Sequence, residues 1–107
     1  MTTYNKLVRD KIPQIIEQSG KKFSARILND QEYIKYLQQK SYEELDEYCS
    51  AETKEDAVEE LADLLEIIHS LAHQHESSIE EVEKVREKKT EKRGGFKERI
   101  LLIEVED

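Results

Sequence analysis

Cysteine, glycine, proline and tryptophan are scarce in this 107-residue chain, which has one cysteine, three glycines, one proline and no tryptophan. A single cysteine, Cys49, cannot form an internal disulfide, which fits a reducing cytoplasm. No apolar run approaches the roughly 20 residues of a membrane-spanning helix, and the N-terminus has no apolar segment typical of a signal peptide. We therefore expect a cytoplasmic protein with no membrane partner.

The charge balance is acidic, with 17 basic against 25 acidic residues and a net charge of −8. This balance argues against nucleic acid as a partner, but a bound cation can still attract a phosphate substrate. Few glycines and prolines, together with many Glu, Lys, Leu and Ile, favour helices. The length allows one domain, residues 1–107, and only 36% of the residues are hydrophobic. We therefore expect a homodimer or a larger homo-oligomer.

Helix-start and helix-stop residues predict a mostly α-helical fold. Pro13 suits the first turn of a short helix that runs to about residue 18. Asn29 or Asp30 can cap a helix over residues 31–50, Thr53 a third to about residue 74, and Ser78 a fourth that ends near residue 94. Residues 23–28 alternate in polarity and residues 99–105 are apolar, so the two segments can pair as a small two-stranded β-ribbon.

One acidic residue of the second predicted helix lies on a face that should be buried. Leu37 marks the centre of an apolar stripe that also holds Tyr33 and Tyr48, and Glu44 falls about 20° from Leu37. A carboxylate in such a place is costly unless another group compensates its charge. Lys40, one turn before Glu44, is either that charge partner or a phosphate contact.

The third predicted helix places two acidic residues beside its apolar stripe. Glu60 and Asp63 are three residues apart and so share a face, which continues one turn later as Ile67. A fully solvated acidic face would not be expected to continue as isoleucine. The predicted core stripe itself consists of Ala57, Leu61, Leu64, Leu65, Ile68 and Ala72.

If these two helices pack antiparallel, Glu44 and Glu47 of one can meet Glu60 and Asp63 of the other. Four carboxylates suit a hard divalent cation such as Mg²⁺ or Mn²⁺ rather than zinc. Such an ion binds and polarises a di- or triphosphate. The alternative is that these residues are ordinary surface acids, which are frequent in any chain with 25 acidic residues.

Four sequence blocks resemble a known family. Residues 43–47, Glu-Glu-Leu-Asp-Glu, and residues 60–63, Glu-Leu-Ala-Asp, resemble the E-E-x-x-E … E-x-x-D signature of the MazG-like all-α NTP pyrophosphatase superfamily. Residues 4–13 and 92–96 resemble a small single-domain branch of it, described as predicted house-cleaning pyrophosphohydrolases and related to phosphoribosyl-ATP pyrophosphohydrolase. Together these blocks extend over nearly the whole chain.

The resemblance implies a MazG-like helical bundle that binds Mg²⁺, forms a dimer or larger assembly, and cleaves an NTP or dNTP to NMP and pyrophosphate. It implies that Glu44, Glu47, Glu60 and Asp63 are the metal ligands. Glu43 or Glu47 would accept the proton of the attacking water, and the sequence does not distinguish between them.

The resemblance also implies basic residues that contact the phosphates. Lys89 and Arg93 fill these roles near the end of the last helix, and Lys40 is a further candidate. Thr90 stands where some relatives carry asparagine, so the phosphate contacts follow the family pattern less closely than the metal ligands do.

Two other functions remain open at this stage. One is a catalytically silent module that binds a nucleotide or a metal, and the other is a helical interaction protein whose charges serve as a solubilising surface. The basic N-terminal residues Lys6, Arg9 and Lys11 form either a solvated arm or a group near the phosphates.

Overall fold

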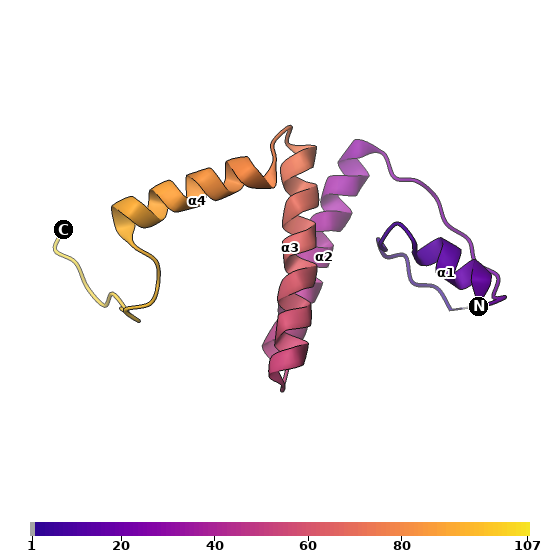
Figure 1. Cartoon of the computed structure of the whole chain (residues 1–107), viewed down its shortest axis with the longest axis horizontal. Helices are drawn as coiled ribbons and strands as arrows, with labels where there is room; N and C mark the ends of the chain where they lie inside the picture. Colours follow the sequence, from indigo (N-terminus) through magenta and orange to yellow (C-terminus); the bar gives the residue numbers. More distant parts are fainter. Residues whose placement is uncertain (1) are drawn as a thin grey trace.

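The computed structural model describes residues 2–107, which form four helices joined by irregular segments (Figure 1). These are α1 (Ile12–Gln18), α2 (Asp30–Ser50), α3 (Lys54–Gln74) and α4 (Ile79–Arg93). No strand occurs between residues 2 and 107. The predicted mostly α-helical fold is therefore confirmed.

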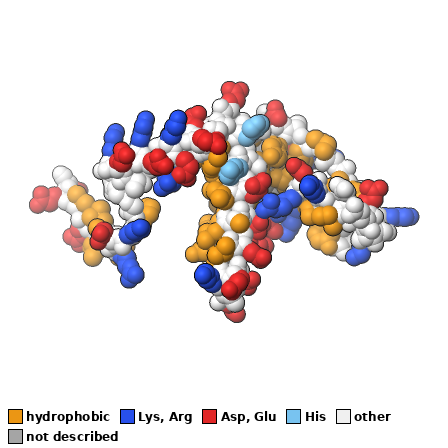
Figure 2. Space-filling model, viewed as in Figure 1, with side chains coloured by type: hydrophobic (Ala, Val, Ile, Leu, Met, Phe, Trp, Pro, Cys, Tyr) orange, Lys and Arg blue, Asp and Glu red, His pale blue; other side chains and the backbone are white. Residues whose placement is uncertain are grey.

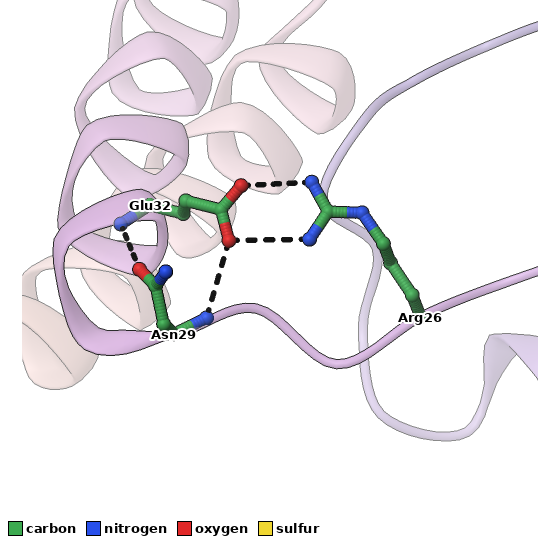
Figure 3. Close-up of polar contacts among 3 residues, drawn as sticks. All are labelled: Arg26, Asn29 and Glu32. Atoms are coloured by element: carbon green, nitrogen blue, oxygen red, sulfur yellow. Dashed lines mark hydrogen bonds and ion pairs between the residues drawn. The ribbon is translucent and has the colours of Figure 1, made fainter.

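The three long helices each begin at a side chain that accepts a hydrogen bond from the first turn. Asn29 accepts from the backbone N–H of Glu32 at 2.9 Å, and the Glu32 carboxylate accepts from the backbone N–H of Asn29 at 3.4 Å (Figure 3). Arg26 donates to both carboxylate oxygens of Glu32, at 3.1 and 2.8 Å. Thr53 and Ser78 cap α3 and α4 at the predicted places. Satisfied N–H groups fix where each helix starts.

Helices α2 and α3 form an antiparallel hairpin that contains the core (Figure 1). Among residues 2–107 only four are buried, namely Leu37 and Glu44 of α2 and Ile67 and Ala72 of α3. Glu44 meets Glu60 across the hairpin. Leu37 and Ile67 are each seven residues, about two turns, farther from the connecting loop, so they lie level with each other. The acidic residues therefore lie about two helical turns from this apolar pair, on the same hairpin.

The apolar stripe predicted as the core of α3 is only partly buried, since Ala57 and Leu64 are half-buried and three other members are exposed. Leu61, Leu65 and Ile68 remain 49%, 50% and 42% exposed, whereas Ala72 is buried as predicted. Helix α2 covers instead the neighbouring face of α3, which carries Ile67. The prediction was wrong for Leu61, Leu65 and Ile68, because α3 has two apolar faces and this chain supplies a partner helix for only one of them.

Helix α4 leaves the hairpin and carries the C-terminal segment away from it (Figure 1). It makes only limited contact with α3, and the described chain measures 61 × 36 × 27 Å. Residues 23–28 lie on the opposite side of the hairpin from residues 99–105, and neither segment is a strand. The predicted two-stranded ribbon does not form within this chain, because the outward turn of α4 separates its two halves.

The described surface is rich in both charge and apolar side chains. Figure 2 shows hydrophobic side chains on the hairpin and along the C-terminal segment. Ile100, Leu101, Leu102 and Ile103 are between 73% and 84% exposed. None of the helices in residues 2–107 is both long enough and apolar enough to cross a membrane.

Candidate metal centre

Glu44 is the buried acidic residue of the hairpin. Only 7% of its surface is exposed, as its position on the apolar stripe of α2 predicted. Its Oε1 lies 3.8 Å from the Nζ of Lys40, one turn earlier in α2, whereas its Oε2 has no hydrogen-bond partner among the described residues. One carboxylate oxygen therefore lies in the protein interior without a donor, which is costly unless a cation or a proton occupies the site.

Three carboxylates from the two helices converge at this point. Glu44 and Glu47 of α2 and Glu60 of α3 each place one oxygen so that all three oxygens lie within 4.8 Å of one another. Glu60 Oε2, like Glu44 Oε2, is buried and has no hydrogen-bond partner in the described chain. The three residues differ in burial, since Glu44 is buried, Glu60 half-buried and Glu47 exposed. The cluster is therefore open to solvent on the Glu47 side.

The close approach of these carboxylates shifts their protonation. Contact with Glu44, followed by loss of hydration and the nearness of Glu47, raises the pKa of Glu60 to about 7. Burial raises the pKa of Glu44, and the nearby charge of Glu47 adds to that effect. Like charges held this close favour a shared proton or a bound cation. The two unpartnered oxygens and the all-oxygen donor set thus fit a hard divalent cation.

The fourth predicted ligand, Asp63, lies outside this group of three. Its Oδ1 accepts a hydrogen bond from Arg9 at 2.8 Å. The interaction is exposed, and it connects α3 to the N-terminal segment. The structure therefore brings together three of the four carboxylates that the sequence indicated, and gives the fourth a basic partner.

Glu43, a predicted catalytic residue, also has a basic partner. Its Oε1 lies 2.7 Å from the Nζ of Lys6, and this hydrogen bond holds the pKa of the Glu43 carboxyl below its usual value. As long as Glu43 stays paired with Lys6, it is weakly basic and a poor proton acceptor. Of the two predicted acceptors, Glu47 is the one in the cluster and open to water.

The predicted phosphate contacts do not meet in one place. Lys40 lies beside Glu44 and lines a small cleft between α2 and the N-terminal segment. Lys89 and Arg93 are exposed on α4, which leaves the end of α3 and extends away from the cluster (Figure 1). Within one described chain, the cations of α4 are therefore separate from the carboxylates.

The two cations nearest the carboxylates, apart from Lys40, come from the N-terminus. Lys6 and Arg9 belong to the basic group that the sequence singled out without deciding its role. Their partners, Glu43 and Asp63, lie 37 and 54 residues away along the chain. No local pattern could pair residues so far apart, although the clustering of basic residues before Pro13 was a visible signal.

No protein-family model, curated protein or solved structure matches this chain. The arguments for a function are therefore the geometry of the acidic cluster and the resemblance of its sequence motif.

Proposed function

We propose that this chain is a Mg²⁺-dependent nucleoside triphosphate pyrophosphohydrolase of the MazG-like type, which converts an NTP or dNTP and water to NMP and pyrophosphate. The observation that carries the proposal is the pair of buried, unpartnered oxygens of Glu44 and Glu60 beside Glu47. Natural proteins rarely leave such groups without a partner, and a hard cation would satisfy both. The order of acidic residues in residues 43–63 gives independent support.

Glu44, Glu47 and Glu60 would hold the ion, with Asp63 as a fourth ligand once its contact with Arg9 is exchanged. When bound, Mg²⁺ supplies positive charge that offsets the charge of the phosphates. In the proposed reaction, water attacks the α-phosphorus, the bond to the α–β bridging oxygen breaks, and pyrophosphate leaves. Glu47 is the carboxylate best placed to accept the water's proton, because it is exposed. Clearing non-canonical nucleotides is the proposed biological role.

Two alternative functions predict different properties for the acidic cluster. A catalytically silent nucleotide- or metal-binding module would keep the cluster and bind Mg²⁺ without turnover. A helical interaction protein would need neither metal nor the burial of Glu44. That burial, with an unpartnered oxygen, favours a metal site over the second rival.

The test is a panel of canonical and damaged NTPs and dNTPs with Mg²⁺, Mn²⁺ or EDTA, in which pyrophosphate and orthophosphate are measured separately. We expect pyrophosphate and NMP, and no reaction in EDTA. Orthophosphate as the main product would refute the mechanism. Metal binding without turnover of any nucleotide would favour the silent module.

We also propose that the working protein is a homodimer or larger. A folded monomer of 12.6 kDa exposes roughly 6,200 Å², whereas this chain exposes 10,306 Å². Its radius of gyration is 18.3 Å, against about 13 Å for a compact chain of this length. An obligate interface covers roughly 1,000–2,500 Å² of each partner, so the excess favours more than one interface per chain.

The exposed part of the apolar stripe of α3, namely Leu61, Leu65 and Ile68, is the proposed contact face for a second copy. Because α4 extends away from its own carboxylates, Lys89 and Arg93 would reach a site only in a neighbouring copy. Sedimentation equilibrium tests the assembly, and a stable monomer at micromolar concentration would refute it.

A further inference from the structure

The N-terminal segment, residues 2–11, runs beside the hairpin at the acidic cluster. Figure 2 shows basic side chains next to acidic ones where this part of the chain meets the hairpin. Lys6 pairs with Glu43 of α2 at 2.7 Å, and Arg9 pairs with Asp63 of α3 at 2.8 Å. The two side chains thus reach both helices that form the cluster.

Both ion pairs are exposed, and Lys6 and Arg9 belong to a segment without regular secondary structure. The side chains of Lys6 and Arg9 remain 55% and 57% exposed. Residues 2–9 have no regular secondary structure, and Asn5 has a φ of 47°, so the chain turns just before Lys6. Exposed ion pairs contribute little to stability, so these side chains can exchange one anionic partner for another at small cost.

A third cation, Lys40, lies beside Lys6. A small cleft between the N-terminal segment and α2 is lined by Lys6 and Lys40 together with Tyr36 and Glu43. Lys40 is also 3.8 Å from the buried Glu44. Lys6, Lys40 and Arg9 therefore border the candidate metal centre from two segments of the same chain, whereas the cations of α4 lie elsewhere.

The formal charges explain why these cations pair with carboxylates here. Five carboxylates, namely Glu43 and the four predicted ligands, lie around the centre against three cations, so negative charge is in excess. A divalent cation would reduce this excess. With the carboxylates occupied by the metal, the cations lose much of their attraction to them and become available to an anion.

We propose that Lys6 and Arg9 of the N-terminal segment, with Lys40, bind the phosphates of the substrate. In this arrangement they exchange Glu43 and Asp63 for phosphate oxygens when metal and substrate enter. The proposal rests on the proposed function in that it takes a metal-bound triphosphate as the ligand. Arg9 has the larger role, because a guanidinium can donate two parallel hydrogen bonds to one phosphate.

The experiment compares the parent with Arg9→Ala, Lys6→Ala and Arg9→Lys. Arg26→Ala is the matched control, since Arg26 makes a similarly exposed carboxylate pair with Glu32 near the start of α2 (Figure 3). Glu32 lies twelve residues before Glu44. Three quantities are measured for each: Mn²⁺ affinity, affinity for inorganic tripolyphosphate with Mg²⁺, and KM and kcat on the best nucleotide of the panel. Tripolyphosphate is used because it does not depend on the base.

We expect Arg9→Ala to bind tripolyphosphate about ten- to a hundredfold more weakly and to raise KM similarly, with Lys6→Ala affected less. Mn²⁺ affinity should stay the same or improve, because Asp63 loses a competing partner. Arg9→Lys should recover part of the loss, and Arg26→Ala should match the parent throughout.

The outcomes separate this proposal from the proposed function. If the parent hydrolyses nucleotides and Arg9→Ala does so equally well, the role of Arg9 is refuted and the hydrolase stands. If Arg9→Ala loses Mn²⁺ and tripolyphosphate together and also melts lower, Arg9 is structural and the proposal fails. A parent that binds tripolyphosphate through Arg9 without turnover supports the proposal and refutes hydrolysis. A parent that neither binds nor hydrolyses refutes both.

Discussion

Replacing Glu44 with leucine should make the metal-free protein more stable and abolish its activity. The parent buries a carboxylate whose Oε2 has no partner and whose other oxygen is 3.8 Å from Lys40. Leaving such a group unsatisfied costs about 1–3 kcal/mol, and a buried leucine side chain gains roughly 1.5–3 kcal/mol over an exposed one. The variant leaves Lys40 without its partner, which removes part of this gain. We expect a net increase in unfolding free energy of about 1–2 kcal/mol, or roughly 5–15 °C in Tm for a domain of this size.

The assay is thermal unfolding of parent and Glu44→Leu, in EDTA and in Mg²⁺, at one protein concentration. Fixed concentration matters because an oligomer melts higher when it is more concentrated. At Mg²⁺ a hundredfold above its Kd, the parent should gain about 2.7 kcal/mol, and Glu44→Leu should gain little. Glu59→Leu is the matched control, since it removes an exposed acid next to Glu60 and should change stability by less than about 0.5 kcal/mol.

Two results would refute this reasoning in different ways. A Glu44→Leu protein that is less stable in EDTA would show that Lys40 and a proton shared with Glu60 already satisfy Glu44. A variant that keeps its activity would remove Glu44 from the metal centre.

Three further predictions follow from the same structure. Because contact with Glu44 raises the pKa of Glu60 to about 7, the folded state holds a proton that the unfolded state releases above about pH 4.5. Stability in EDTA should therefore fall as the pH rises from 4.5 through 7, and Glu60→Gln should flatten this slope in pH-dependent melts; an unchanged slope would contradict the assignment. Leu65→Glu should reduce the mass seen in sedimentation while Leu65→Met does not, and equal masses would show that this face of α3 is not an interface. Arg93→Ala should weaken substrate binding and keep metal binding and helix content. If Arg93 serves the site of a neighbouring copy, an equal mixture of the Arg93→Ala and Glu44→Leu proteins should regain about one quarter of the parent activity when dimers form at random. Full activity of Arg93→Ala alone would show that its assignment is wrong.

Local sequence rules predicted the helices well because helix ends depend on neighbouring residues. Asn29, Thr53 and Ser78 each accept a backbone N–H from three residues on, so four or five residues contain the whole signal. The additional contact of Arg26 with Glu32 was not predicted, because it depends on the conformation of the irregular segment between α1 and α2.

The acidic cluster was partly predictable for a similar reason. Periodicity placed Glu44 on the buried face of α2, and a short loop made an antiparallel hairpin the simplest way to bring it to Glu60. The partners of Glu43 and Asp63 were not predictable, because the residues that supply them, Lys6 and Arg9, belong to a segment without periodicity.

The apolar residues that the chain leaves exposed are the basis of the proposed contact with a second copy. Leu61, Leu65 and Ile68 have helical spacing, which is typical of selection for burial, yet about half of each is exposed. The apolar tail, Ile100 to Ile103, is exposed as well. Hydrophobic spacing indicates which face of a helix is suited to burial, but it does not indicate whether the covering side chains belong to the same chain. The α3 core stripe was thus assigned to one chain, whereas its exposed residues form the face that we propose a second copy covers.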